Sequence, residues 1–518
     1  MIGFVVLLTV LTSGRAYIVD PGPVVKATVG EVWPRPHYQS RTDNFFLIDP
    51  KNIQITIVGH TCDTLEQAAK RYLDIISNIT NQLIRHPQKE LDRVPHVSRI
   101  REIALNLTTP CEHMPYLGMD ERYYLAGSGR IISYSIWGIL RGLETYSQLI
   151  TPHKDGLLRV PDIRIRDYPR FPHRGFLLDT SRHYMSMETI YNVLDGMEYN
   201  KLNVFHWHIV DDHSFPYQSI NFPELSEKGA YMPGWVYTQE DIANVIEYAR
   251  LRGIRVVAEF DVPGHTRSWG QSHPEILTQC EGNYAGKMGP INPIKSTSYD
   301  FLKVLFKEVL DVFPDRYLHV GGDEVGFECW ESNSQISSYV RTKGITFTDL
   351  QRIFMENVTR MITDRQAIPV VWQEAMVKDV NMPNNTVVQV WTGNWRDLLQ
   401  TFTKKGHRVL MSQCWYLDHL LTGGDWLKFY RCEPHDFLGT DDQKKLVMGG
   451  EACMWSEVVN NRNVLQRIFP RVSAAAERLW SPRETTNTDN AKRRLEEHTC
   501  RMIHRGIPAQ PPNGPGIC

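Results

Sequence analysis

The sequence predicts an α/β protein in which a (β/α)8 barrel is preceded by a smaller α/β domain. Short apolar runs of strand length recur through most of the chain after residue 170, and amphipathic segments of helix length separate most of them. Eight parallel strands with helical crossovers close into a barrel, and polar residues then gather at the carboxyl ends of the strands. The runs are 175–179, 202–208, 254–260, 316–320, 368–372, 386–391, 408–412 and 446–450.

The crossovers are predicted from apolar residues at helical spacing, as in 187–199 and 239–252. The fifth crossover breaks this pattern, because residues 373–385 are few and rich in Asn and Pro. We therefore expect the barrel to be irregular there.

A domain boundary is predicted near residues 167–174, where DYPRFPHR places two prolines in a short polar stretch. We assign residues 17–166 to the N-terminal α/β domain and 167–518 to the barrel. The first domain has no clustered carboxylates, metal-ligand spacing or nucleophile motif, so we interpret it as a packing domain. Its expected strands are 53–58, 103–107, 123–125 and 130–133, and its expected helices are 64–83 and 135–149.

Residues 1–16 have the features of a secretory signal peptide: an apolar run at 4–11 and the small residues Gly14 and Ala16 at a plausible cleavage point. No other stretch is long enough to span a bilayer, so we expect no stable membrane insertion. A formal net charge of −2 gives no reason to expect a nucleic-acid partner. Passage through the secretory pathway is also indicated by glycosylation triplets at Asn78, Asn106, Asn357 and Asn384.

Two adjacent acids end the stretch YLHVGGDEV at residues 317–325. Gly321 and Gly322 remove side chains where the strand ends, so a ligand or another backbone can come close. Asp323 and Glu324 then point in different directions, and their mutual repulsion should leave one of them protonated to a higher pH. A carboxylic acid beside a carboxylate is the pair that glycoside cleavage requires. The alternative is a helix cap with no chemistry.

The residues that follow the predicted strands combine acids, an arginine and a histidine with tryptophan and tyrosine. Such a set can stack on a sugar ring and also bond its hydroxyls. They are Asp179 with Arg182, Asp211, Asp261 with His265, Asp323 with Glu324, Trp372 with Glu374, Trp391, Trp415 with Tyr416, and Trp455 with Glu457.

Several of these segments together resemble the β-N-acetylhexosaminidases of glycoside hydrolase family 20, above all the lysosomal enzymes of animals. The resemblance runs from about residue 20 to Cys518. The matching motifs are RGFLLDTSR at 174–182, NVFHWHIVDD at 203–212, EFDVPGH at 259–265, HVGGDEV at 319–325, VVWQE at 370–374 and GGEACMWSE at 449–457.

The resemblance implies retaining cleavage in which the substrate's own acetamido oxygen attacks the anomeric carbon. Glu324 would protonate the leaving oxygen and later activate water, while Asp323 would orient the acetamido N–H and stabilise the cationic intermediate. Tyr416 would bond the acetamido oxygen. Asp211 and His265 would set the protonation of Glu324.

The family also implies a substrate pocket with an aromatic wall. Trp372, Trp391 and Trp455 would enclose the acetamide and stack on the ring, and Arg182 and Glu457 would hold ring hydroxyls. No cofactor and no metal are implied. The expected partners are glycans with a terminal β-linked N-acetylhexosamine and a second copy of the chain in a homodimer.

The chain has nine cysteines, so at least one thiol is left unpaired. The resemblance implies the disulfides Cys62–Cys111, Cys280–Cys329 and Cys500–Cys518. Whether Cys414 and Cys432 form a fourth bridge stays open at this point.

Two departures from the mammalian pattern concern the substrate. Asp418 follows Trp415-Tyr416-Leu417, where the mammalian α subunit has Asn and the β subunit has Asp. An acid facing the 6-position should repel a 6-sulfate, which predicts a preference for neutral substrates. The segment 281–289 is short and lacks the α-type loop linked to activator-assisted ganglioside hydrolysis.

Three other functions compete with this interpretation. His206 and His208 share one face of a strand and suggest a metal-dependent barrel hydrolase, but no further histidines follow the fifth and sixth strands, so we interpret both as interior residues. A catalytically inactive sugar-binding protein is disfavoured by the intact acids and Tyr416. An exo-hydrolase specific for chitin oligomers would use the same residues, and the sequence does not separate it from a glycoconjugate enzyme.

Overall fold

The computed structural model describes residues 23–79, 96–376, 382–419, 424–516 and 518, and it contains the predicted barrel. The predicted signal peptide lies outside these residues. Eight parallel strands close in sequence order, because the last of them pairs with the first. They are β9 (His173–Asp179), β10 (Val204–Val210), β11 (Arg255–Phe260), β14 (Tyr317–His319), β15 (Ile368–Trp372), β16 (Val387–Val390), β17 (Arg408–Met411) and β18 (Val447–Met454).

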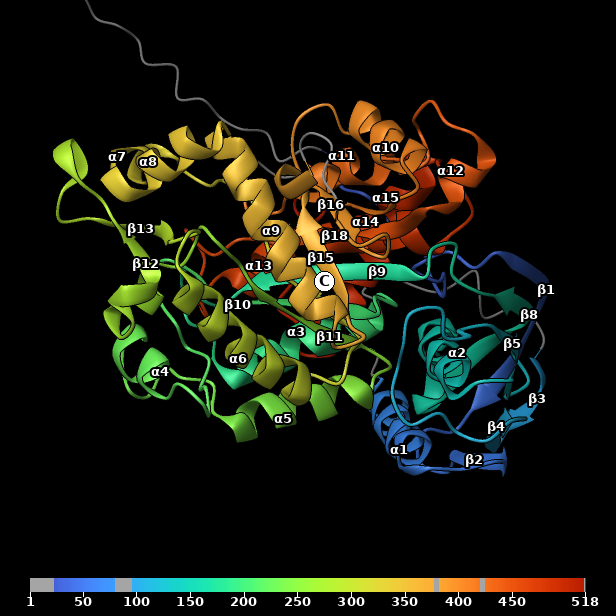
Figure 1. Ribbon diagram of the computed structural model, residues 1–518. Coiled ribbons are helices and arrows are strands. Elements are labelled where there is room, and N and C mark those ends of the chain that lie inside the picture. The colour runs from blue at the N-terminus through green and yellow to red at the C-terminus, as the bar shows by residue number, and fades with distance from the viewer. Residues whose placement is uncertain (1–22, 80–95, 377–381, 420–423, 517) are drawn as a thin grey trace, which may run out of the picture.

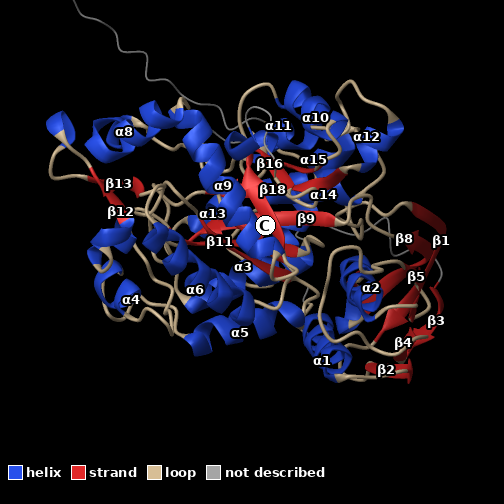
Figure 2. Ribbon diagram, viewed as in Figure 1, coloured by secondary structure: helices blue, strands red, loops and turns tan. Residues whose placement is uncertain are grey.

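Helices cover the outside of the barrel, and Figures 1 and 2 show them around the central strands. The prediction of an irregular fifth crossover is confirmed: the described residues between β15 and β16 hold only a 3-10 turn at Gln373–Met376. The crossover helices are α3 (Met187–Tyr199), α5 (Gln239–Arg250), α6 (Ser296–Val312), α9 (Phe347–Thr363), α10 (Trp395–Lys404) and α12 (Asp441–Lys445), and α14 (Arg471–Trp480) follows the last strand.

Additional elements lengthen the loops of the barrel and end the chain. Among the described residues, none of the helices is long and apolar enough to cross a membrane. These elements are α4 (Glu224–Gly229), the hairpin β12 (Leu277–Gln279) and β13 (Met288–Ile291), α7 (Glu328–Ser332), α8 (Ser334–Lys343), α11 (Trp426–Arg431), α13 (Val464–Ile468) and α15 (Thr488–His504).

The smaller N-terminal domain is a mixed sheet in the order β2-β4-β6-β5-β8-β1-β3, with β7 paired to β8. Helices α1 (Asp63–Ser77) and α2 (Ile136–Leu149) lie between this sheet and the barrel (Figures 1 and 2). The strands are β1 (Tyr38–Ile48), β2 (Gln54–Gly59), β3 (His96–Ile100), β4 (Glu102–Leu107), β5 (Tyr123–Ala126), β6 (Arg130–Ser133), β7 (Thr151–Pro152) and β8 (Leu158–Asp167).

Buried ion pairs join this domain to the barrel. Glu121 accepts hydrogen bonds from Arg141 of α2 at 2.8 Å and from Arg174 of β9 at 2.5 Å. Asp167, at the end of β8, pairs with Lys201 at 3.0 Å. All five side chains are almost completely buried, so each charge depends on its partner for compensation.

The interior of the barrel is layered, because residues two apart on a strand point to the same side. The layer nearest the amino ends of the strands is apolar and contains Val204, Val257, Tyr317, Val370, Val387, Leu410 and Met448. The next residues inward along these strands are largely polar or charged, which is unusual for a barrel core. This charged layer contains His206, Glu259, His319, Gln389 and Glu451, all buried.

Four disulfides are present. They include the three pairs that the resemblance implied, Cys62–Cys111, Cys280–Cys329 and Cys500–Cys518. The question left open by the sequence is answered by a fourth bridge, Cys414–Cys432, and Cys453 is a free, buried thiol.

The four glycosylation triplets lie in different settings. Asn384 is exposed in a turn before β16, and Asn78 is exposed at the end of α1. Asn106 on β4 and Asn357 within α9 are partly buried. Carbohydrate at each of them stays a prediction.

Candidate active site

The Asp323–Glu324 turn follows β14 directly and depends on the two glycines before it. Gly321 and Gly322 have φ angles of +63° and +96°, which favour glycine. A Cβ on Gly321 would overlap the Asp261 carboxylate, while the Gly322 N–H donates to Asp261 Oδ1 at 2.8 Å. The glycines therefore let the chain turn tightly against Asp261.

The two acids of this turn have different surroundings. The side chain of Asp323 is 10% exposed and that of Glu324 is 58% exposed. Glu324 also has a φ of +47°, a left-handed conformation that costs a non-glycine residue on the order of 1 kcal/mol. The fold thus holds Glu324 in an unfavourable backbone conformation at the carboxyl end of the barrel.

A third carboxyl group, Asp261 at the end of β11, lies against Asp323. Burial, the charge of Asp323 and the charge of Glu259 raise the pKa of Asp261 well above its usual range. The sequence predicted that Asp323 or Glu324 would keep its proton to a higher pH, and the structure adds Asp261 as a group that holds a proton. Its place after a predicted strand was the only signal for it in the sequence.

His265 connects the predicted relay residues. Its Nδ1 lies 3.3 Å from Asp211 Oδ1, and its Nε2 lies 3.7 Å from Asp323 and 3.8 Å from Glu324. Burial lowers the pKa of His265, but the charge of Asp323 and the hydrogen bond to Asp211 outweigh it and raise the pKa to about 10. His265 is therefore an imidazolium beside the side chains of Asp211, Asp323 and Glu324.

Arg182 contacts Asp211 Oδ2, whereas His265 contacts Asp211 Oδ1. Its guanidinium is 3.0 Å from Asp211 and 3.3 Å from Asp179, and it sits over the Trp455 ring at 5.1 Å. Asp179 also accepts the backbone N–H of Ser456 at 3.0 Å, so this acid ties Arg182 to the loop after β18. The sequence placed Asp179 after a strand without giving it this role.

The predicted aromatic residues form one wall. Ring centroids are 6.5 Å apart for Trp372 and Trp391, 6.0 Å for Trp372 and Trp455, and 5.8 Å for Trp391 and Tyr416. The last pair is stacked, and burial raises the pKa of Tyr416 well above its usual range, so its hydroxyl stays protonated. The wall combines apolar ring faces with one hydroxyl donor.

Glu374 also belongs to this wall, and no role was assigned to it from the sequence. Both of its carboxylate oxygens lie 2.9 Å from Trp391 Nε1, which donates to them. Burial, and then the charge of Asp323, raise the pKa of Glu374 to about 7. A carboxyl in the VVWQE motif was visible in the sequence, but its contact with a tryptophan from the next strand was not.

Asp418 and Glu457 lie on the Arg182 side of the pocket. Burial raises the pKa of Asp418 to about 6, and the charge of Glu457 adds to this rise. The charge of Glu457 also acts on Arg182. Glu457 is itself exposed, at the rim.

Several polar atoms around the wall are buried and have no hydrogen-bond partner within the described part of the chain. Burying such an atom unpaired costs about 1–3 kcal/mol. They are Asp323 Oδ1, Arg182 Nε, His265 Nε2 and Asp418 Oδ1. Beside Glu324 and His265 a cavity of about 630 Å³ extends to Tyr284, Lys287 and the Cys280–Cys329 bridge.

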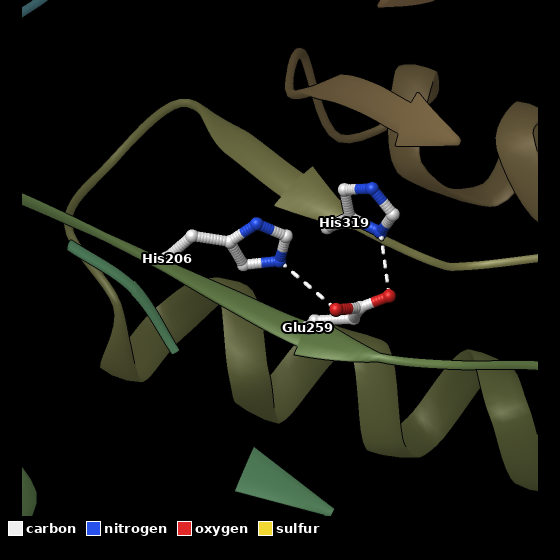
Figure 3. Close-up of side chains that lie close together, drawn as sticks. All are labelled: His206, Glu259 and His319. Atoms are coloured by element: carbon white, nitrogen blue, oxygen red, sulfur yellow. Dashed lines mark ion pairs between the residues drawn. The ribbon is translucent and has the colours of Figure 1, made fainter. Parts of the chain in front are cut away.

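Among the residues that the structure describes, three clusters of histidine and acid side chains are close enough to hold a cation. They are His206, Glu259 and His319; Asp211, Asp212 and His265; and Asp261, His265 and Asp323. In the first, His206 Nε2 and His319 Nδ1 each lie 3.0 Å from a different oxygen of Glu259, as Figure 3 shows. His206 and His208 are the ion-pair partners of Glu259, and we assign this cluster no metal. The interpretation of His206 and His208 as interior residues is confirmed, because both are buried between carboxylates.

Comparison with known proteins agrees with this geometry. Residues 171–483 match the family model described as glycosyl hydrolase family 20, catalytic domain, and residues 32–149 match one described as beta-acetyl hexosaminidase like. Beta-hexosaminidase subunit beta of Rattus norvegicus is 43% identical over 493 residues, covering 93% of this chain and 91% of that protein.

Two further relatives extend the comparison. Subunit alpha of Bos taurus is 43% identical over 500 residues and covers 93% of each chain. The crystal structure of Flavobacterium johnsoniae chitobiase superposes with a TM-score of 0.81 at 29% identity, covering 92% of this chain and 73% of that one.

Proposed function

This chain belongs to glycosyl hydrolase family 20 and is a glycoside hydrolase, and we propose that it is a retaining exo-β-N-acetylhexosaminidase. It removes a terminal non-reducing GlcNAc or GalNAc from glycoconjugates or chitooligosaccharides. The substrate's acetamido group acts as the nucleophile, and the intermediate is an oxazolinium ion.

The observation that carries this proposal is the wall of Trp372, Trp391, Trp455 and Tyr416 beside the Asp323–Glu324 turn, whose Asp323 charge acts on Tyr416 and Glu374. An N-acetylated sugar offers groups that match these residues: an amide N–H for the Asp323 carboxylate and hydroxyl groups for Arg182 and Asp418. The tryptophan faces supply an apolar surface for the acetamide methyl and the ring.

We assign the following roles in the reaction on the basis of these positions. Asp323 holds the acetamido N–H, and Tyr416 donates to the acetamido oxygen, so that this oxygen is aimed at the anomeric carbon. Glu324, exposed toward the cavity, protonates the departing glycosidic oxygen and then takes a proton from the incoming water. The carboxylate of Asp323 stabilises the positive charge of the intermediate.

Arg182, Glu457 and Asp418 hold the ring hydroxyls. Trp372, Trp391 and Trp455 enclose the sugar. Arg182 is well suited to its role, because Asp179 and Asp211 fix the orientation of its guanidinium.

The requirement for the acetamide tests this proposal directly. Turnover of an aryl β-N-acetylglucosaminide should exceed that of the matching aryl β-glucoside by at least about 10³-fold, because the second compound has no internal nucleophile. The comparison uses one purified protein and one leaving group. Equal cleavage of the two would mean that the chain does not use substrate assistance.

Asp418 is expected to disfavour 6-sulfated substrates. Its pKa of about 6 means that it is mostly neutral at pH 5 and mostly charged at pH 7, so repulsion of the sulfate should grow as the pH rises. The ratio of kcat/KM for unsulfated over 6-sulfated N-acetylglucosaminide should therefore increase across this range. Asp418→Asn should remove the increase. Equal turnover of both substrates by the unaltered protein would contradict the assignment.

We also propose the secretory pathway, with a lysosomal or extracellular destination, as the location of the protein. Four disulfides and the similarity to animal hexosaminidases support this.

A homodimer is proposed because the relatives are named as subunits.

A further inference from the structure

Glu259 occupies the centre of the charged layer beneath the pocket and is completely buried. Its Oε1 accepts a hydrogen bond from Trp372 Nε1 at 2.7 Å and lies 3.0 Å from His319 Nδ1. Its Oε2 lies 2.7 Å from His208 Nδ1 and 3.0 Å from His206 Nε2. Figure 3 shows this carboxylate between His206 and His319. One side chain thus contacts both the aromatic wall and the interior histidines.

His208 connects Glu259 to the active site. Its Nδ1 lies 2.7 Å from Glu259 Oε2, and its Nε2 lies 2.7 Å from Asp211 Oδ2. A ring with a carboxylate at each nitrogen donates from both, which requires the imidazolium form. Burial lowers the pKa of His208, but the charge of Glu259 and the hydrogen bond to Asp211 outweigh it and raise the pKa to about 9.

Asp211 in turn is the carboxylate that holds Arg182 at 3.0 Å and His265 at 3.3 Å. Burial favours its protonated form, but hydrogen bonds from His208, His213 and His265 hold its pKa well below the usual range. Charges therefore alternate in sign from Glu259 through His208 and Asp211 to the two cations of the pocket.

We propose that Glu259 is a positioning residue for the hydrolysis: through His208 it keeps Asp211 ionised and bonded to Arg182 and His265, and through Trp372 it orients the pocket wall. This inference rests on the proposed function. Glu259 itself does not touch the substrate.

The other titratable groups around Glu259 are largely paired with one another. His206 on β10 lies between Glu259 and Glu451 of β18, at 3.0 and 2.7 Å. Glu451 is also paired with His173 of β9 at 2.6 Å. His319 of β14 completes the surroundings, and the charge of Glu259 acts on Asp261 above it. His208 is the group that passes the influence of Glu259 to Asp211.

Glu259→Gln tests the proposal with little change in shape. The amide oxygen can still accept from Trp372, and the amide N–H₂ can donate to His208 if that ring becomes neutral. Neutral His208 still donates to Asp211 but no longer supplies a positive charge, so the pKa of Asp211 rises. The acid limb of the pH profile of kcat/KM should move to higher pH by at least about half a unit, with the largest loss of activity at the acid end.

Glu308→Gln is the matched control. Glu308 is a buried carboxylate on α6, and its hydrogen-bond donors within the described residues are neutral, among them Tyr217 and Asn221. This variant loses a buried charge without acting on Asp211, so its pH profile should match that of the unaltered protein.

If Glu259→Gln does not fold, His208→Gln provides the test instead, because it removes the His208 imidazolium next to Asp211. The proposal is overturned if the acid limb of the pH profile of kcat/KM stays in place in whichever of these variants folds. It is also overturned if the acid limb moves by the same amount in Glu308→Gln. Failure of the proposed function is a separate result, since it is read from the unaltered protein on substrates with and without the acetamide.

Discussion

Glu324→Gln is expected to abolish hydrolysis of substrates with poor leaving groups while binding is retained. The amide cannot protonate the glycosidic oxygen, and loss of a general acid costs about 10²–10⁴-fold. Glu324 faces the cavity with more than half of its side chain exposed, so the substitution should not disturb the core. Steady-state kcat on a natural oligosaccharide and on an activated aryl glycoside measures the effect, and the loss should be much smaller for the aryl glycoside.

Glu328→Gln is a suitable control, because Glu328 is an exposed acid that lines the same cavity. Its kcat should stay close to that of the unaltered protein. If Glu324→Gln kept full turnover on the oligosaccharide, the role of general acid would have to pass to another residue.

Asp323→Asn should lower kcat by about 10²–10³-fold, the range found when one electrostatic contact to a transition state is removed. The asparagine retains the shape but loses the negative charge that stabilises the intermediate and the second acceptor oxygen for the acetamido N–H. Because the contact strengthens as positive charge develops, kcat should fall more than substrate binding weakens. Pre-steady-state and steady-state kinetics on one N-acetylglucosaminide separate the two effects.

Asp315→Asn provides the comparison for Asp323→Asn. Asp315 is also a nearly buried carboxylate near β14, but it precedes the strand and pairs with Arg255 at 2.7 Å. A change there should affect thermal stability without a selective effect on kcat. Unchanged turnover in Asp323→Asn would remove Asp323 from the mechanism.

The barrel, and the residues that lie at the carboxyl ends of its strands, were predictable because both depend on local sequence patterns. Each strand is a short apolar run, and parallel strands bring the residues that follow them to one edge. Asp211, Asp323 and Trp455 therefore meet in space although they are far apart in sequence. The described residues between β15 and β16 contain no crossover helix, and this too was predictable locally, since Asn and Pro do not continue a helix.

What the sequence did not predict depends on partners from distant segments. Strands β1 and β8 pair along most of their length, yet β1 shows no alternation of exposed and buried residues in its first half and β8 contains Pro161. Glu259 and Glu374 are ordinary acids in the sequence, and only the neighbouring strands supply the histidines and tryptophans that define their roles. The pKa of Asp261 likewise follows from burial beside Asp323, which no spacing encodes.

The buried charges between the N-terminal sheet and the barrel determine how the chain can be divided. A barrel made without residues 23–167 would leave Arg174 and Lys201 without the counterions Glu121 and Asp167. Losing one partner of a buried ion pair costs about 3–5 kcal/mol, and two such losses equal much of the roughly 5–15 kcal/mol that stabilises a whole domain. We therefore expect that the barrel cannot fold stably when it is produced alone, because the N-terminal domain supplies the counterions of its buried cations.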